Sequence, residues 1–262
     1  MTKRKNDLKQ PADKNFDKIA KKFAQNIYGT SKGIVRQRVL MRDLSTLDLE
    51  HSAPLSVIDI GGGQGQIAIE LAKSGHHITL CDISSEMLSI AKQRVSALGL
   101  DSQFQYVHAP LQQLPELLDN DYDLVMCHAV FEWLTDARKA MDILTHFKRA
   151  GGVISLMFYN LHAKRLGNIL VGNFDYVRNG LQVKKTVSLN PQHPLEPQEV
   201  LNWCDELSLN VIKKSGVRCF HDYLKDPSMK DSNLDEIIEM ELAWGEQEPY
   251  ASIARYMHLL LK

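Results

Sequence analysis

The sequence predicts a doubly wound α/β fold, in which helices cover both faces of a mostly parallel sheet. Two observations carry this prediction. Short apolar runs alternate with amphipathic stretches between residues 55 and 158, and the first of these runs leads into a glycine-rich turn at residues 61–65. The chain has 262 residues, of which 44% are hydrophobic and 24% are charged, so it is long enough to build one sizeable core.

The expected elements follow from the hydrophobic periodicity. Strands are expected at residues 55–60, 78–81, 104–107, 122–127, 153–158, 210–217 and 253–261, and helices at residues 66–73, 85–98, 136–148, 197–207 and 234–244. Ser84 is expected to cap the helix at 85–98, and Gly151-Gly152 to end the helix at 136–148. Because strands alternate with helices in the first part, the strands there should be joined by right-handed crossovers and run parallel.

The ends of the chain and one internal segment differ from this pattern. Residues 1–13 are polar and charged and are expected to form a flexible tail. The remainder, residues 14–262, is expected to form a single domain that begins with two helices within 14–50, linked at Tyr28-Gly29-Thr30. Residues 161–196 lack the periodicity and are interpreted as an insertion, which in a compact domain is usually functional.

Charge and cysteine content exclude several classes of protein. The 31 Lys and Arg residues balance 32 Asp and Glu residues, so the chain is no uniformly basic nucleic-acid binder. The charge is nevertheless polarised: residues 148–185 hold seven basic and one acidic residue, and residues 226–248 hold eight acidic and one basic. The sequence contains no long apolar segment, and its first residues are charged. We therefore expect no membrane span and a cytoplasmic location. The four cysteines lack metal-ligand spacing, which predicts reduced packing residues and no metal.

A glycine-rich loop carries the strongest functional signal. It follows the first expected strand, in Asp59-Ile60-Gly61-Gly62-Gly63-Gln64-Gly65, at the edge where open α/β sheets bind ligands. The dinucleotide fingerprint would need a glycine where Gln66 stands, so that fingerprint does not match. Asp82 ends the next expected strand, 21 residues after Gly61, where a carboxylate can accept hydrogen bonds from both hydroxyls of a ribose.

The loop, read as D-x-G-x-G-x-G from Asp59 to Gly65, resembles motif I of class I S-adenosylmethionine-dependent methyltransferases. The resemblance implies their Rossmann-like fold, with a mostly parallel seven-stranded sheet and helices on both faces, and S-adenosylmethionine as cofactor. It also implies a set of cofactor-binding residues, namely Arg36, Gly61, Gly62, Gly63, Asp82, Ile83, Leu111, Gln112 and His128. Arg36 is assigned to the carboxylate of the cofactor's methionine part, and residues 108–113 to adenine, with Gln112 and Gln113 where many members carry an acidic residue.

Segments outside this motif are similar to one subfamily, the bacterial tRNA 5-carboxymethoxyuridine methyltransferases. They lie at residues 26–30, 32–36, 155–160, 172–177, 216–223 and 247–250, so the similarity runs from about residue 15 onward. Lys184 and Lys185 stand where a longer lysine run is expected. The similarity implies methylation of the carboxylate of 5-carboxymethoxyuridine at the tRNA wobble position, giving the methyl ester, with the anticodon region of tRNA as partner.

An ionised carboxylate needs no base before it attacks a sulfonium methyl, so the expected task of the enzyme is alignment. Candidates for the residues that align the substrate are Tyr28, Tyr159, Arg218, His221 and Tyr223. Two alternatives stay open. One is a methyltransferase acting on a small carboxylic acid, and the other is a non-catalytic protein that binds the cofactor or RNA. The oligomeric state is not determined by the sequence.

Overall fold

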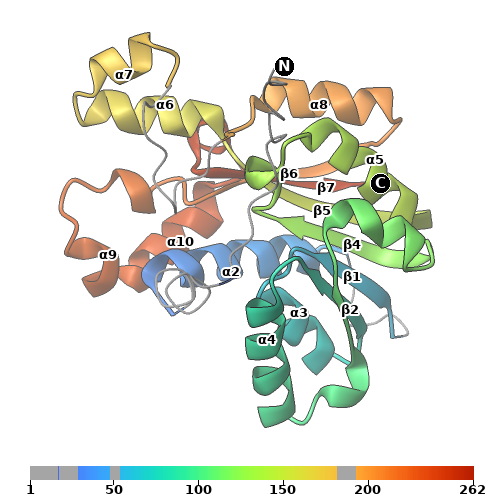
Figure 1. Ribbon diagram of the computed structural model, residues 1–262. Helices are drawn as coiled ribbons and strands as arrows, with labels where there is room; N and C mark the ends of the chain where they lie inside the picture. Colours follow the sequence, from blue (N-terminus) through green and yellow to red (C-terminus); the bar gives the residue numbers. More distant parts are fainter. Residues whose placement is uncertain (1–16, 18–28, 48–53, 182–192) are drawn as a thin grey trace, which may run out of the picture.

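The computed structural model describes residues 17, 29–47, 54–181 and 193–262, and Figure 1 shows a central sheet between layers of helices. Within these residues the strands are β1 Ser56–Ile60, β2 His77–Asp82, β3 Phe104–His108, β4 Tyr122–His128, β5 Lys148–Tyr159, β6 Val211–Val217 and β7 Tyr256–Leu261. They form a seven-stranded sheet in the order β3-β2-β1-β4-β5-β7-β6. Strands β1 to β5 pair in parallel, and β7 runs antiparallel between β5 and β6. The predicted class I sheet is therefore confirmed.

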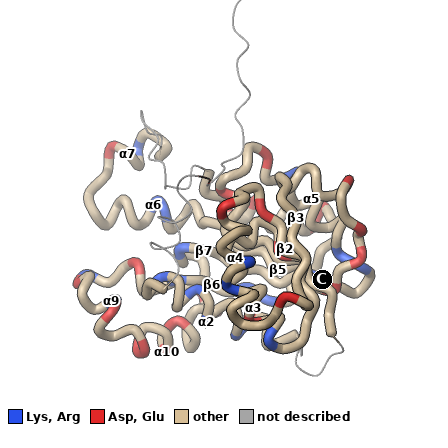
Figure 2. The backbone as a smooth tube through the Cα atoms, turned by 60° about the horizontal axis from the view of Figure 1, so that its bottom comes forward, with Lys and Arg blue, Asp and Glu red and all other residues tan. Residues whose placement is uncertain are grey.

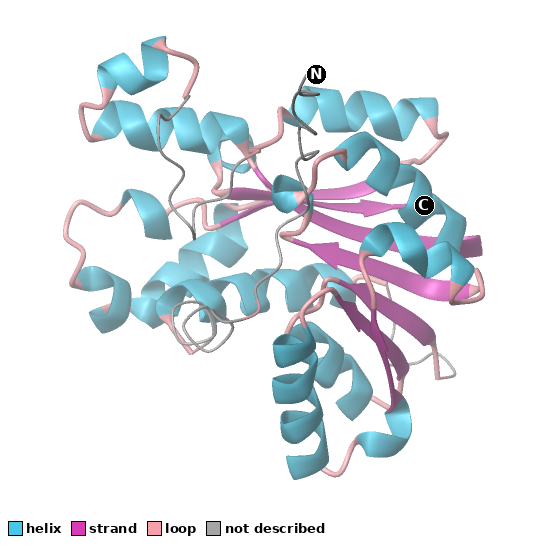
Figure 3. Cartoon of the chain, in the orientation of Figure 1, coloured by secondary structure: helices cyan, strands magenta, loops and turns pink. Residues whose placement is uncertain are grey.

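Helices cover both faces of the sheet (Figure 3). The α-helices are α2 Ser31–Ser45, α3 Gln66–Lys73, α4 Ser85–Ala97, α5 Ala137–Phe147, α6 Leu161–Leu170, α7 Phe174–Arg178, α8 Pro197–Glu206, α9 Met229–Ser232, α10 Leu234–Trp244 and α11 Tyr250–Ile253. Among the described residues, 3-10 helices lie at η2 Asp101–Gln103, η3 Leu111–Glu116, η4 Phe131–Trp133 and η5 His221–Tyr223. The predicted cap of α4 is confirmed, because the Ser84 hydroxyl accepts a hydrogen bond from the Met87 amide at 3.2 Å.

Two hydrophobic layers form the core because successive side chains of a strand point to opposite faces of the sheet. Ile58 and Leu156 face the layer that includes residues of α5 and α8. Their neighbours Val57 and Met157 face the layer that includes residues of α2, α3 and α4. All four cysteines are free and buried, in agreement with the prediction that they are packing residues. The described part of the chain contains no helix that is both long and apolar enough to cross a membrane.

Several predicted boundaries are wrong. Gly151 and Gly152 do not end a helix, because α5 ends at Phe147 and both glycines lie inside β5. The pairing of β5 with β4 shifts register there, and a Cβ on Gly152 would lie 2.9 Å from the Tyr122 carbonyl oxygen, so the glycine allows a close backbone approach. The last strand begins at Tyr256 rather than at residue 253. The insertion contains the helices α6 and α7, whereas the first expected N-terminal helix and the tail lie outside the described residues.

The carboxyl ends of the parallel strands meet at one edge of the sheet. Helices α6 and α7 lie on one side of this edge, and α9 and α10 lie on the other (Figure 1). The fold therefore places the glycine-rich loop after β1, the loop after β4 and the end of β5 beside one another.

A buried carboxylate attaches α10 to this edge. Glu241 of α10 is fully buried, and its two oxygens accept hydrogen bonds from the backbone amides of Cys219, Phe220 and His221 at 2.7, 2.9 and 3.1 Å. These amides belong to the turn after β6, in which Arg218 has a positive φ of 63°. Glu241 thus stabilises a strained turn that carries several charged side chains.

We expect the substitution Glu241→Ala to destabilise the protein, because it leaves three buried amide groups without an acceptor. The free energy of unfolding should fall by about 3 kcal/mol or more, as measured by urea denaturation. The matched control is Glu239→Ala, an exposed position on the same helix, which should change stability by less than about 0.5 kcal/mol. Equal stabilities of the two variants would contradict this role of Glu241.

Candidate functional site

The glycine-rich loop is shaped by its backbone. The amides of Gly61 and Gly62 both donate to the carbonyl oxygen of Cys81 in β2, at 2.8 and 3.2 Å. Gly61, Gly63 and Gly65 have φ values of 69°, 58° and 69°, which lie in the left-handed region that favours glycine. Gly65 also caps α3. Glycine occurs at every second position of this loop because the backbone has a positive φ at each of those positions.

A cavity lies against this loop, and most of the predicted cofactor residues line it. Its lining includes Arg36, Gly61, Gly63, Asp82, Ile83, Leu111 and His128 from that set. Gly62 and Gln112 do not line it. A Cβ on Gly62 would collide with Asp59 and Leu80, so this glycine is required for packing beneath the loop, and Gln112 lies exposed on η3.

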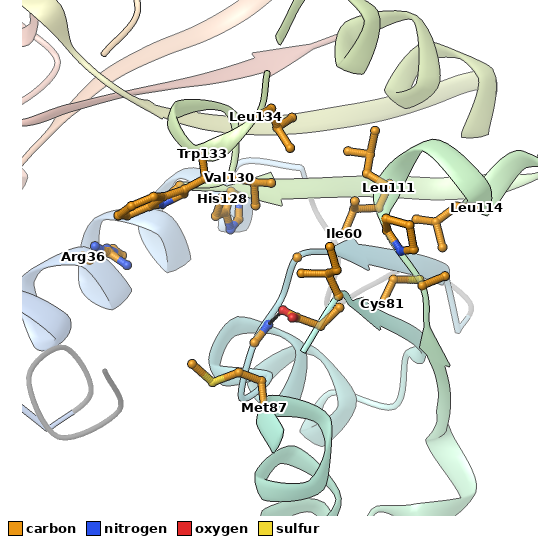
Figure 4. Close-up of a pocket in the computed structure, with 17 residues that line it drawn as sticks. Arg36, Ile60, Cys81, Met87, Leu111, Leu114, His128, Val130, Trp133 and Leu134 are labelled. Atoms are coloured by element: carbon orange, nitrogen blue, oxygen red, sulfur yellow. Dashed lines mark hydrogen bonds between the residues drawn. The ribbon is translucent and has the colours of Figure 1, made fainter. Parts of the chain in front are cut away.

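The two ends of the cavity differ in chemistry (Figure 4). Leu111, Leu114 and Cys81 lie at one end, whereas Arg36, His128 and Trp133 lie at the other. Leu114 was not predicted as a site residue, because its local pattern is that of an ordinary packing residue, and Trp133 was predicted only as part of the segment at 128–133 that flanks the cofactor. An apolar end and a cationic end suit a ligand that carries a flat ring system at one end and an anionic group at the other.

Asp82 also lines the cavity and joins the loop to β2. Its carboxylate accepts hydrogen bonds from the Gly63 amide at 2.9 Å and the Ser84 amide at 2.7 Å. Burial raises the pKa of Asp82 to about 6, although both amides oppose the shift by stabilising the anion. The group is therefore mostly ionised at neutral pH. Each oxygen can accept a further hydrogen bond, as two neighbouring hydroxyl groups would require.

A second buried acid lies under the loop. Asp59 is the last residue but one of β1 and is 4% exposed. Burial, reinforced by the nearby Asp82 carboxylate, raises the pKa of Asp59 to about 7. The Asp59 carboxyl is thus partly protonated at neutral pH, and it packs against Gly62 of the loop.

His128 ends β4 and is held by a chain of buried side chains. Its Nε2 lies 2.8 Å from the Ser155 hydroxyl, which lies 2.8 Å from Nε2 of His258, and Nδ1 of His258 lies 2.7 Å from Asp43. Burial, and then the neighbouring His258 and Arg36, lower the pKa of His128 well below its usual value. His128 is therefore neutral at physiological pH, and the chain fixes the orientation of its ring beside the cavity.

Arg36 comes from α2 and lies at the cationic end of the cavity. Its guanidinium carbon is 5.0 Å above the centre of the Tyr256 ring, and its Nε is buried without a hydrogen-bond partner. A buried N–H group normally has an acceptor, so this arrangement calls for a ligand with acceptor oxygens. A carboxylate matches the planar fork of donors.

Tyr159 and Arg218, two of the residues predicted to align the substrate, lie at a pair of tyrosine rings next to Arg36. Tyr159 and Tyr256 lie with their ring centres 5.7 Å apart. Arg218 forms a bidentate ion pair with Asp222 at 2.5 and 2.6 Å, and His221 lies between Asp222 and the Ser31 hydroxyl, 3.1 Å from each.

The remaining members of that predicted set differ in their placement. The Tyr223 hydroxyl donates to the Ile253 carbonyl oxygen at 2.6 Å, so its proton is used within the fold. Tyr28 lies outside the described residues. Arg255, which sequence reasoning missed, has its guanidinium carbon 4.4 Å from the centre of the Tyr159 ring. It falls within an expected strand, and nothing in its local pattern distinguishes it from a surface cation.

The basic segment predicted from residues 148–185 does not form one surface. Lys148 and Arg149 start β5, roughly 30 Å from the end of that strand at the site, and Arg149 pairs with Asp123. Arg178 pairs with Asp175, and residues 184 and 185 lie outside the described part of the chain. Lys164 on α6 does lie near the site, because the charge of Arg255 acts on it. The prediction of one basic segment is wrong because β5 places Lys148 and Arg149 at the opposite edge of the sheet from the site.

The basic residues near the site come from separate elements and not from one contiguous segment. Figure 2 shows basic residues near β6 and β7 and acidic residues along α9 and α10. Within the ranges that the structure describes, no three His, Cys, Asp or Glu side chains gather as they would around a metal ion.

Comparison with known proteins identifies relatives. The methyltransferase-domain family matches residues 58–156. A tRNA 5-carboxymethoxyuridine methyltransferase of Escherichia coli K12 is 42% identical over 248 residues, which cover 94% of this chain and 95% of that protein. A ubiquinone biosynthesis O-methyltransferase of Erwinia tasmaniensis is 27% identical over 158 residues, which cover 58% of this chain and 60% of that protein. The crystal structure of magnesium protoporphyrin IX methyltransferase from Synechocystis, with bound SAH, shares the fold at a TM-score of 0.63 and 17% identity, covering 94% of each chain.

The raised pKa of Asp59 predicts a pH-dependent stability. Because its folded-state pKa of about 7 exceeds the ordinary value of 3.8, Asp59 contributes stability at low pH that is lost as the pH rises from about 4 to about 7. The variant Asp59→Asn stays neutral, so its stability should rise relative to the wild type across this window, by on the order of 4 kcal/mol at pH 8. Urea denaturation at several pH values measures the difference. The exposed control Asp121→Asn should show no such trend, and a pH-independent difference for Asp59→Asn would contradict the prediction.

Proposed function

The chain belongs to the tRNA 5-carboxymethoxyuridine methyltransferase family, and from this membership we propose that it methylates the carboxylate of 5-carboxymethoxyuridine at the wobble position of tRNA. The product is the methyl ester. The observation that carries the proposal is the 42% identity over 94% of the chain, since it includes the elements after β5 that lie beyond the general methyltransferase domain. Those elements supply Arg218, Asp222 and Arg255 at the site.

The cavity fits S-adenosylmethionine, which supplies an electrophilic methyl group on sulfur when it is bound. Arg36 would bind the methionine carboxylate through its unpartnered guanidinium, and Asp82 would accept hydrogen bonds from the ribose hydroxyls. The apolar lining around Ile83, Leu111 and Leu114 would hold adenine. Gly61 and Gly63 let the backbone approach the ligand closely. The neutral ring of His128 would flank the sulfonium end.

The acceptor requires alignment rather than activation. A carboxylate is ionised at neutral pH, so no group of the enzyme has to remove a proton. The buried chain from His128 to Asp43 supports this view, because it leads away from the cavity into the core and serves to hold the ring in place. Holding the oxygen in line with the methyl group can contribute several kcal/mol to catalysis.

The anticodon loop would approach over the carboxyl edge, between α6 and α10. A wobble nucleotide is unpaired in free tRNA and can be drawn into a pocket, as proteins commonly do with single-stranded bases. Lys164 and Arg165 on α6 would contact the phosphates. A cytoplasmic location follows from the substrate, because tRNA is found there.

The substitution Asp82→Asn should weaken cofactor binding by about tenfold or more, because one carboxylate acceptor is lost and an amide group faces the loop. Calorimetry with S-adenosylhomocysteine measures the affinity. In the wild type the affinity should also fall as the pH drops below about 6, as Asp82 becomes protonated, and the variant should lose this dependence. The control is Glu86→Gln, an exposed acid on α4. Unchanged affinity in Asp82→Asn would show that the ribose assignment is wrong.

The activity is tested with two pools of tRNA, one carrying 5-carboxymethoxyuridine and one lacking its carboxymethoxy group, together with methyl-labelled S-adenosylmethionine. Nucleoside mass analysis should find a base-labile methyl ester in the first pool only. Transfer should decrease after RNase treatment and with rising salt, since phosphate contacts are screened by salt. Label that appears only in small carboxylic acids, regardless of RNase and salt, would instead support the alternative substrate class.

A further inference from the structure

Three guanidinium groups gather around the two tyrosine rings at the carboxyl edge. Arg36 and Arg218 lie 5.0 and 5.8 Å from the centre of the Tyr256 ring, and Arg255 lies 4.4 Å from the centre of the Tyr159 ring. They come from α2, from the turn after β6 and from the residue before β7. Like charges repel one another, so an anion stabilises a cluster of this kind.

The three groups differ in their partners. Arg218 donates to both oxygens of Asp222 and is thereby neutralised. Arg36 and Arg255 donate no side-chain hydrogen bond to any other described residue, and the Nε of each is buried without a partner. Nε of Arg255 is 3.7 Å from Asp222, which is within ion-pair distance but too far for a hydrogen bond. Because only 32% of the Arg255 side chain is exposed, water satisfies its donors incompletely.

The surroundings of Arg255 carry an excess of positive charge. Burial lowers the pKa of Lys32, and Arg218 and Arg255 lower it further. Burial and Arg255 likewise lower the pKa of Lys164.

The facing acids offset these cations only in part. Asp222 is committed to Arg218, and Glu132 is fully buried with neither oxygen hydrogen-bonded. Burial raises the pKa of Glu132 to about 7, so it is only partly ionised at neutral pH. The site therefore favours an incoming anion.

The proposed reaction involves two carboxylates, and the structure holds two guanidinium groups, those of Arg36 and Arg255, whose buried Nε donates to no carboxylate. Arg36 lines the cofactor cavity, whereas Arg255 does not line it and lies beyond it over Tyr159. We propose that Arg255 binds the carboxylate of the acceptor nucleotide and makes the enzyme selective for a carboxylated wobble base. This inference rests on the proposed function. The stacking of the guanidinium on Tyr159 fixes the plane in which the carboxylate is bound.

The test compares two anticodon stem-loop RNAs that differ only at the wobble base, one with 5-carboxymethoxyuridine and one with the uncharged 5-methoxyuridine. Fluorescence anisotropy in the presence of S-adenosylhomocysteine gives the affinity of each. Wild-type protein should bind the carboxylated RNA about tenfold or more tightly than the other, because a charged hydrogen-bonded pair is lost with the carboxylate. Arg255→Gln should bind both RNAs within about twofold of each other and keep its affinity for S-adenosylhomocysteine.

Matched variants separate this role from other causes. Arg36→Gln should show the reverse, with weakened binding of S-adenosylhomocysteine and preserved RNA selectivity. Lys164→Gln should lower the affinity for both RNAs by the same factor, as loss of a phosphate contact does. Arg255→Lys keeps the charge but not the fork and should retain intermediate selectivity, and thermal unfolding shows whether each variant is folded.

Each outcome bears on a different conclusion. Wild-type selectivity that persists in both Arg255 variants would overturn the assignment of Arg255 while leaving the methyltransferase activity on tRNA intact. Loss of S-adenosylhomocysteine binding in Arg255→Gln with RNA selectivity unchanged would also overturn it. Wild-type protein that transfers no methyl group to carboxylated tRNA would overturn the proposed function itself.

Discussion

The burial of charge at one edge of a parallel sheet is the constraint on which the site depends. Parallel strands end together, so the loops after β1, β2, β4 and β5 bring charged side chains and backbone amides into a small volume. Desolvation there raises the pKa values of Asp59, Asp82 and Glu132 and lowers those of His128 and Lys32. A site of this kind is poised to bind a ligand that supplies the missing charges.

The buried polar groups fall into two sets. Asp43 and Glu241 are fully hydrogen-bonded within the fold, the first to His258 and Arg42 and the second to three backbone amides. Arg36, Glu132 and Arg255 keep buried atoms without partners. His76 and Tyr106, which do not line the cavity, also have such atoms. Unsatisfied buried groups are destabilising, so the three at the site mark a place where a bound ligand could supply the missing hydrogen bonds.

The known relatives match different portions of the chain. The general methyltransferase domain spans residues 58–156, which include most of β1, all of β2 to β4, most of β5 and the whole glycine-rich loop. The more distant methyltransferases match about three fifths of the chain, whereas the tRNA-modifying relative matches nearly all of it. Residues outside 58–156 therefore carry what distinguishes this family, and those after β5 include the turn at Arg218 and the cation Arg255.

The sequence by itself determined the fold class, the positions of nearly all strands, the cap at Ser84 and the motif from Asp59 to Asp82, because these depend on local periodicity and on short contiguous spacing. Only the tertiary structure decided which charges meet. It separated Arg149 from the site by the length of β5, and it joined Asp43 to His258 across 215 positions of the chain. It also placed Arg255 over Tyr159, a pairing that depends on the antiparallel packing of β7 against β5 and that no local pattern encodes.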